Sequence, residues 1–290
     1  MKYLGLVSVC IPTYNAVKYI QETIECFLNQ TYKNVEIIIQ DDCSTDGTWE
    51  LVNSLYKNNE KIRLYRNENN LGIGPNWNAA YEKVQGEYVI IFNADDLVNE
   101  RFVELGLKEF TNHLNLDIVT FKFQYLFEKN GAIAEHKPQL YLKTGLQSNI
   151  LNLVLINMPF SWDFTITKKN SLEKLKKNGQ LFLNTQVCDF ALWIDAGINH
   201  FKLYYISKNI GYYRKHSTNN SSIPLAEINS FLSDVNKIYW NKLRHNNYYK
   251  RRIKQIRSTT LKYFLKTGRL KAIRLFLKTY FPFSTHKWLT

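Results

Sequence analysis

Long apolar runs, paired cysteines and acidic residues near the C-terminus are all missing from this sequence of 290 residues. No stretch reaches the roughly 18 consecutive apolar residues that a membrane-spanning helix needs, so no such helix is predicted. The four cysteines form no C-x-x-C pair, which argues against a zinc site and against a disulfide framework. The apolar start of the chain reaches Pro12 without a signal-cleavage pattern, so we expect a first strand there rather than a signal peptide. A reduced, cytoplasmic protein is the resulting expectation.

Acidic residues are absent from residues 235–290, although this segment holds 15 of the 38 Lys and Arg residues. The rest of the chain has slightly more acidic than basic residues, so this tail alone explains the net charge of +13. Its apolar residues recur at three- and four-residue spacing, as in amphipathic helices. Two interpretations stay open: an interfacial anchor on an anionic membrane, or helices packed on the domain with a solvated basic face. A nucleic-acid-binding protein that acts through this tail is the less favoured alternative. Salt-sensitive DNA binding is expected of almost any such charge run and would not by itself support it, so no nucleic-acid partner is expected.

Short strands and amphipathic helices alternate along the first hundred residues. Strands are predicted at residues 6–11, 35–39, 62–66 and 89–92, with helical spacing between them. After residue 100 the pattern is less regular, with a strand at 117–127, a hairpin turn at Asn130-Gly131 and a helix at 149–157. The alternation predicts an α/β fold with a doubly wound, mostly parallel sheet flanked by helices.

Two adjacent carboxylates, Asp95 and Asp96, directly follow the predicted strand at 89–92. Loops at this end of parallel strands are where open α/β sheets bind ligands. Unpaired, the two carboxylates would repel each other, and one would hold its proton. A hard divalent cation such as Mg²⁺ or Mn²⁺ removes this conflict by binding carboxylate and phosphate oxygens. A turn with an Asp as a helix N-cap is the competing interpretation.

Four short motifs appear in a fixed order in the first hundred residues. They are Pro12-Thr13-Tyr14-Asn15, Gln30-Thr31-Tyr32, Asp41-Asp42-Cys43-Ser44-Thr45-Asp46-Gly47-Thr48 and Asn93-Ala94-Asp95. Their order and spacing resemble the opening of the family-2 inverting glycosyltransferases of the GT-A fold, of the type that builds bacterial surface polysaccharides. The resemblance implies a GT-A-like domain over 1–225, with a nucleotide-sugar-binding half (1–98) and an acceptor-binding half (99–225). A basic amphipathic helical region would follow over 226–290.

The resemblance also implies roles for individual residues. Asp189, at the start of a predicted helix, would be the general base that takes the proton of the acceptor hydroxyl. The metal, Mn²⁺ or Mg²⁺, would be bound by Asp95, Asp96 and His216 and would assist departure of the nucleotide. The nucleotide sugar would contact Pro12, Thr13, Tyr14, Asn15, Asp41, Asp42, Asn78, Asn93, Ala94, Asp95 and Arg214. Turn and helix-cap chemistry is the alternative for the Asp residues, and a surface loop is the alternative for 211–217.

Three positions depart from the family pattern. Asn93 replaces the first carboxylate of the D-x-D motif, Cys188 replaces the Glu before the base, and Trp77 stands where many members have Arg. An Asn still binds metal through its carbonyl oxygen, but without charge. A nucleotide-sugar-binding protein without turnover is therefore the first alternative. The main expectation is a transferase that moves a sugar from a UDP-sugar to a glycan or lipid-linked oligosaccharide, at the inner face of the cell membrane.

Overall fold

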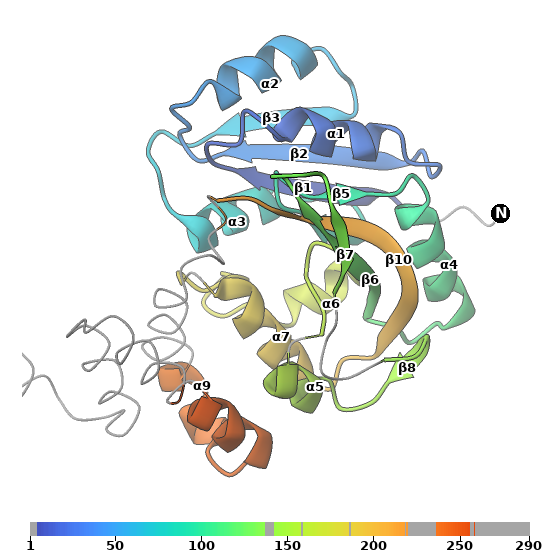
Figure 1. The fold of residues 1–290 in the computed structure, drawn as a ribbon, viewed down its shortest axis with the longest axis vertical. Helices are drawn as coiled ribbons and strands as arrows, with labels where there is room; N and C mark the ends of the chain where they lie inside the picture. The colour runs from blue at the N-terminus through green and yellow to red at the C-terminus, as the bar shows by residue number, and fades with distance from the viewer. Residues whose placement is uncertain are drawn as a thin grey trace, which may run out of the picture.

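The computed structural model describes residues 5–136, 142–157, 159–185, 187–217, 219, 236–255 and 258. Its strands are β1 (Val7–Thr13), β2 (Val35–Asp41), β3 (Ile62–Arg66), β4 (Tyr88–Ile91), β5 (Leu97–Val98), β6 (Ile118–Phe127), β7 (Ile133–Glu135), β8 (Gly145–Gln147), β9 (Thr165–Lys168) and β10 (Leu203–Lys215). Its helices are α1 (Ile20–Leu28), α2 (Thr48–Tyr56), α3 (Ile73–Tyr81), α4 (Phe102–Asn112), α5 (Ile150–Asn157), α6 (Lys169–Glu173), α7 (Cys188–Ile198) and α9 (Asn236–Leu243). Figure 1 shows the strands as one twisted layer with helices around it.

The sheet runs in the order β3-β2-β1-β4-β9-β6-β10-β5, with β7 paired to β6 and β8 paired to β10. The first four of these strands are mutually parallel, and β10 is parallel to β6. Strand β9 lies antiparallel between β4 and β6, and so joins the two parallel groups into one sheet. Every residue of β1 and β2 is buried, as expected for central strands covered on both faces. The predicted α/β fold with a mostly parallel sheet flanked by helices is confirmed.

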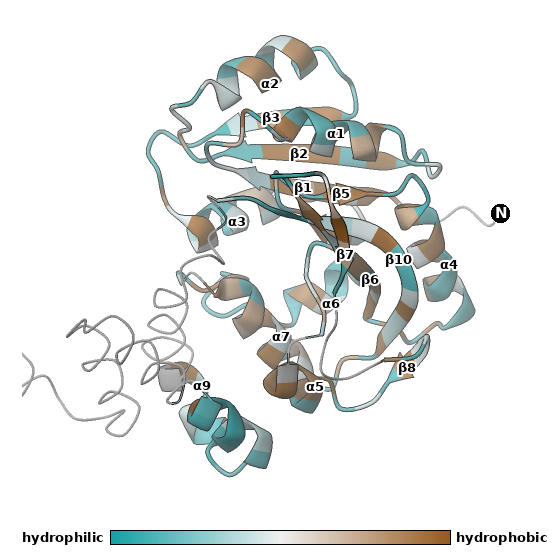
Figure 2. Ribbon diagram, in the orientation of Figure 1, coloured by the Kyte–Doolittle hydropathy of each residue, from teal (hydrophilic) through white to brown (hydrophobic). Residues whose placement is uncertain are grey.

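Alternate residues of the central strands supply an apolar core on each face of the sheet, because successive side chains of a strand point to opposite sides. Ile37 and Ile39 of β2 belong to the core that contains residues of α1, α2 and α4. Ile38 belongs to the other core, which contains residues of α3, α5, α6, α7 and α9. Figure 2 shows apolar colour along the central strands and on α5 and α7.

The end of the first strand differs from the prediction. Strand β1 continues through Pro12, which we expected to end it; pairing of β1 with β4 stops at Cys10, so Pro12 needs no backbone N–H on that side. Helix α3 begins at Ile73, directly after Gly72, whose φ of 85° favours glycine. Residues Leu97–Val98 form the short strand β5, and the next helix starts at Phe102.

The described part of the C-terminal region packs on the domain. Its buried side chains are Tyr239, Leu243, Tyr249 and Ile253, and all four belong to the core that contains α7. Its Lys242, Arg244, Lys250, Arg251 and Lys254 are exposed. For these residues the structure matches the interpretation of packed helices with a basic outer face. Residues 259–290, which hold most of the predicted amphipathic pattern, and the predicted boundary at 225/226 lie outside the described residues. Within the described part of the chain, no helix is long and apolar enough to cross a membrane.

Candidate functional site

Asp95, in the loop after β4, meets the residues that follow β10. The Nε2 of His216 lies 2.8 Å from the Oδ2 of Asp95, and the Nδ2 of Asn219 lies 3.2 Å from the same oxygen. The Asp95 side chain remains 23% exposed, so this corner is open to a ligand. A carboxylate and an imidazole that converge are two suitable ligands for a divalent cation. No three His, Cys, Asp or Glu side chains form a complete metal site among the described residues, so a bound substrate would have to supply further oxygens.

Asp96 has a different environment from its neighbour. It is 1% exposed, and its Oδ1 accepts a hydrogen bond of 2.8 Å from the backbone N–H of Arg214. Its Oδ2 is buried and has no hydrogen-bond partner among the described residues. Burial, together with the nearby carboxylates of Asp95 and Asp163, raises the pKa of Asp96 well above its ordinary value. These contacts suit a residue that ties β10 to the loop after β4 better than a ligand at the open metal corner.

Arg214 is held by protein groups on several sides. Its Nε donates to the carbonyl oxygen of Asp95 at 2.8 Å, and its Nη2 pairs with Glu22 of α1 at 2.5 Å. Its guanidinium also lies over the ring of Tyr19, 5.0 Å from the centroid. Arg214 therefore fixes the backbone beside Asp95. A direct bidentate contact with a diphosphate would require it to leave Glu22.

The acidic residues Asp41, which ends β2, and Asp42, which follows it, have different surroundings. The oxygens of Asp42 accept three hydrogen bonds from the loop before α3, from the Nδ2 of Asn67 and the backbone N–H groups of Leu71 and Gly72. Asp42 thus shapes this loop. Asp41 accepts a bond from the Ser44 N–H, but its Oδ1 is buried and has no hydrogen-bond partner among the described residues. A buried acceptor without a partner is costly, and a donor group of a ligand would satisfy it.

The loop after β1 is tied to the loop after β2. Asn15 donates its backbone N–H to the Ser44 hydroxyl and accepts a bond from the Thr45 N–H, each at 2.9 Å. Pro12 and Thr13 are buried in β1, whereas Tyr14 is 50% exposed. Tyr14 is therefore accessible from solvent in this loop.

Asn78 joins α3 to the segment before α7. Its Oδ1 accepts from the backbone N–H groups of Leu181 and Phe182, both at 2.9 Å, and its Nδ2 donates to the Phe182 carbonyl at 2.8 Å. The neighbouring Trp77 packs edge-on against the Phe182 ring, with 5.1 Å between ring centroids. Both side chains pack α3 against the segment before α7, and Asn78 is buried, at 5% exposure.

Asp189 lies in the first turn of α7 and is half-buried. Burial raises the pKa of its carboxyl, and backbone N–H groups at the start of the helix oppose this shift. A raised carboxyl pKa suits a general base, because the proton affinity then lies closer to working pH. The preceding Cys188 is fully buried, and burial raises the pKa of its thiol far above the ordinary value. Its thiol therefore does not take over the role of the Glu that the family pattern has at this position.

Asp163, in the segment before β9, was not among the predicted site residues. Its Oδ1 accepts the backbone N–H of Asn93 at 3.0 Å, and its Oδ2 accepts the Ser161 hydroxyl at 2.5 Å. Burial raises its pKa to about 7, and the charges of Asp95 and Asp189 add to the shift. Asp163 therefore lies within electrostatic reach of both the metal corner and the candidate base.

The remaining residues of the loop after β4 are held by neighbouring elements. Ala94 is buried, and its carbonyl accepts a bond of 3.0 Å from the Thr23 hydroxyl of α1. Asn93 contributes its backbone N–H to Asp163, as described above. The loop that carries Asp95 is thus fixed from α1, from β10 and from the segment before β9.

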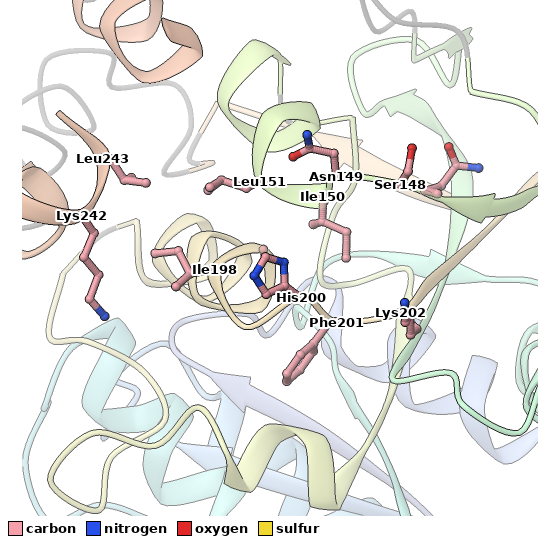
Figure 3. A pocket seen from close by; sticks show the side chains of 12 residues that line it. Ser148, Asn149, Ile150, Leu151, Ile198, His200, Phe201, Lys202, Lys242 and Leu243 are labelled. Atoms are coloured by element: carbon pink, nitrogen blue, oxygen red, sulfur yellow. The ribbon is translucent and has the colours of Figure 1, made fainter. Parts of the chain in front are cut away.

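A cavity of about 680 Å³ lies at the far end of α7. It is bordered by residues 147–151, 197–198, 200–202 and 242–243. Figure 3 shows the apolar side chains of Leu151 and Leu243 facing each other. Along the helix the cavity is about 13 Å from Asp189, at 1.5 Å per residue, so it is separate from the candidate site.

A sequence model of the family described as "Glycosyl transferase family 2" matches residues 8–176. An uncharacterized glycosyltransferase of Methanocaldococcus jannaschii is 30% identical over 249 residues, which cover 84% of this chain and 83% of that protein.

Two solved structures share the fold. The structure of S. aureus TarS in complex with UDP-GlcNAc has a TM-score of 0.69 at 22% identity, covering 94% of this chain and 79% of that one. The mannosyltransferase PcManGT from Pyrobaculum calidifontis, in complex with GDP-Man and Mn²⁺, has a TM-score of 0.63 at 16% identity, covering 99% and 82%.

Proposed function

Because the chain belongs to glycosyl transferase family 2, we propose that it transfers a sugar from a UDP-sugar to a glycan or lipid-linked oligosaccharide, with inversion and with a divalent cation. The observation that carries this proposal is the contact between Asp95 and His216, 2.8 Å apart at the edge of the sheet. It unites a carboxylate of the D-x-D-like motif with a residue that lies far along the chain.

The donor is proposed to bind across the loops after β1, β2 and β4. The Oδ1 of Asp41, which has no hydrogen-bond partner within the described part of the chain, can accept a hydrogen bond from a uracil N–H or a ribose hydroxyl, and the exposed Tyr14 can cover the base. The two solved structures of this fold were determined with nucleotide sugars, which supports this donor class. The preference for UDP follows the complex of TarS, which is the more similar of the two.

Asp95 and His216 fit a divalent cation, since one is a partly exposed carboxylate and the other an imidazole directed at it. When bound, a cation at this corner supplies positive charge that offsets the charge developing on the departing nucleotide. Arg214 keeps the Asp95 backbone in place through its carbonyl bond. The complex of PcManGT with Mn²⁺ supports manganese as the first cation to test.

Asp189 is proposed to accept the proton of the acceptor hydroxyl. As that oxygen forms a bond to the anomeric carbon, the bond from this carbon to the diphosphate breaks, and the proton passes to the Asp189 carboxylate. The raised pKa of Asp189 favours this transfer.

An Asp189→Asn variant keeps the size of the side chain and removes the base. We expect transfer to fall about 10²- to 10⁴-fold while donor binding is unchanged. Release of UDP from UDP-sugars, measured with a cell-extract glycan acceptor, checks this. An Asn variant with wild-type transfer would contradict the base assignment.

The basic outer face of the C-terminal region is proposed to bind the anionic inner surface of the cell membrane, where a lipid-linked acceptor would lie. Each basic residue near such a surface contributes about 1 kcal/mol. Deleting the region would also remove the buried Ile253, so we would instead replace Arg244, Lys250, Arg251 and Lys254 by Gln.

The matched control replaces four exposed lysines elsewhere, at Lys57, Lys61, Lys108 and Lys129. We expect only the C-terminal variant to lose binding to vesicles that contain phosphatidylglycerol. Equal binding by both variants would refute membrane contact through this face.

A further inference from the structure

We propose that Tyr19 is a positioning residue for the metal corner, and that its ring holds the His216 imidazole in the orientation directed at Asp95. The inference rests on the metal site proposed above. Tyr19 lies at the N-cap of α1, nearly two hundred positions before His216 in the chain. The two rings are stacked, with 4.7 Å between their centroids and 24° between their planes.

The stack restricts rotation of the His216 ring, and the orientation of this ring decides whether His216 can serve as a ligand. An imidazole on a flexible side chain can rotate its ring, and such rotation would move Nε2 away from the Asp95 carboxylate. The Tyr19 ring covers one face of the imidazole and leaves Nε2 at its 2.8 Å contact with Asp95 Oδ2. The residues that orient a metal ligand typically change metal affinity 10- to 100-fold when removed.

Tyr19 is itself anchored from two sides. Its hydroxyl donates a hydrogen bond of 2.7 Å to the Glu128 carboxylate, in the turn between β6 and β7. Burial and this bond raise the pKa of Tyr19 to about 12, so the hydroxyl remains a donor at neutral pH. The guanidinium of Arg214 lies over the same ring, 5.0 Å from its centroid. The start of α1, the end of β10 and the β6–β7 turn therefore meet at this one side chain.

The contacts of Tyr19 separate this role from ordinary packing. Its side chain is half-buried and belongs to neither of the two apolar cores. Its aromatic and hydrogen-bonding partners, His216, Arg214 and Glu128, are all polar residues at this corner. A substitution of Tyr19 should therefore disturb the metal corner more than the fold.

The experiment measures Mn²⁺ binding in the presence of saturating UDP, from the electron paramagnetic resonance signal of free Mn²⁺. Four variants are compared with the wild type: Tyr19→Ala, Tyr19→Phe, His216→Ala and Tyr204→Ala. Tyr204 is the matched control, because it is a half-buried tyrosine that contacts another histidine, His113, with 5.0 Å between ring centroids. Binding of UDP without metal reports whether each variant retains the nucleotide site.

We expect Tyr19→Ala to weaken Mn²⁺ binding about 10- to 100-fold, with metal-free UDP binding unchanged. Tyr19→Phe, which keeps the ring and loses only the bond to Glu128, should lose less, and Tyr204→Ala should match the wild type. In transfer assays the Mn²⁺ concentration at half-maximal rate should rise in Tyr19→Ala, while the rate at saturating Mn²⁺ is largely kept.

Three results would overturn the inference. Wild-type Mn²⁺ binding by Tyr19→Ala, with weak binding by His216→Ala, would refute the role of Tyr19 and leave the metal site intact. Equal losses in Tyr19→Ala and Tyr204→Ala would identify a general destabilisation. Wild-type binding by His216→Ala would refute the proposed metal site itself, and the inference with it.

Discussion

Replacing Asp163 by Asn should stabilise the protein at alkaline pH. The carboxyl of Asp163 is 4% exposed, and its pKa is raised from 3.8 to about 7, mainly by burial. A tenfold change in proton affinity corresponds to 1.36 kcal/mol, so ionised Asp163 costs the folded state up to about 4 kcal/mol. An Asn avoids this cost. Its carbonyl can still accept the Asn93 N–H, and its amide can donate to the Ser161 hydroxyl oxygen.

The sign of the pH dependence follows from the two pKa values. Below pH 3.8 the carboxyl is protonated in both the folded and the unfolded protein, so it makes no difference to stability. Between pH 3.8 and about 7 the unfolded chain releases the proton and the folded protein retains it, so the free energy of unfolding falls as pH rises. Above pH 7 the full penalty is present. The gain from Asp163→Asn should therefore be largest at pH 8 and close to zero at pH 4.

Urea unfolding in the presence of EDTA, at pH 4, 6 and 8, measures this gain directly. Asp117→Asn is the control, because Asp117 also accepts bonds from a serine hydroxyl and a backbone N–H but lies away from the site. We expect a pH-dependent gain for Asp163→Asn and none for Asp117→Asn. A stability difference at Asp163 that is the same at pH 4 and pH 8 would refute the reasoning.

Two further substitutions test the contact of α3 with residues 181–182 and the contact of α9 with α7. Asn78→Ala leaves the N–H groups of Leu181 and Phe182 without their buried acceptor. Urea unfolding should show a free energy of unfolding lower by about 1–3 kcal/mol for each group. An unchanged free energy of unfolding would show that this segment does not dock on α3. Tyr239→Phe removes the hydrogen bond of 2.5 Å to the Asp195 carboxylate, so the free energy of unfolding should fall by about 1.5–3 kcal/mol. An unchanged free energy of unfolding would contradict docking of α9 on α7.

The first hundred residues could be predicted well because their signals are local. Apolar runs of strand length and helical spacing between them depend only on neighbouring residues, and they correctly indicated β1 to β4 and the helices between them. The family motifs are likewise local, since each is a run of eight or fewer consecutive residues. The predicted end of β1 before Pro12 was wrong because the effect of a proline depends on where pairing with β4 ends, which no local pattern shows.

The rest of the candidate site depends on contacts between distant segments. Asp163 reaches Asn93 because β9 inserts antiparallel beside β4, and nothing in the residues around 163 indicates that pairing. Arg214 and Asn78 carry the polar groups expected of ligand contacts, but in the structure those groups bind Glu22 and the 181–182 backbone. The basic tail left two interpretations open, because charge and spacing alone do not show which apolar surface covers a helix.

Calorimetric titration of UDP, with and without Mn²⁺, tests directly whether Asp95 and His216 bind a divalent cation together with the nucleotide. It would be made on the wild type and on the Asp95→Ala and His216→Ala variants, with GDP as the comparison nucleotide. We expect Mn²⁺ to strengthen UDP binding to the wild type. Both variants should lose this enhancement and still bind UDP in the absence of metal. Equal enhancement in the variants, or no nucleotide binding by the wild type under either condition, would contradict this expectation.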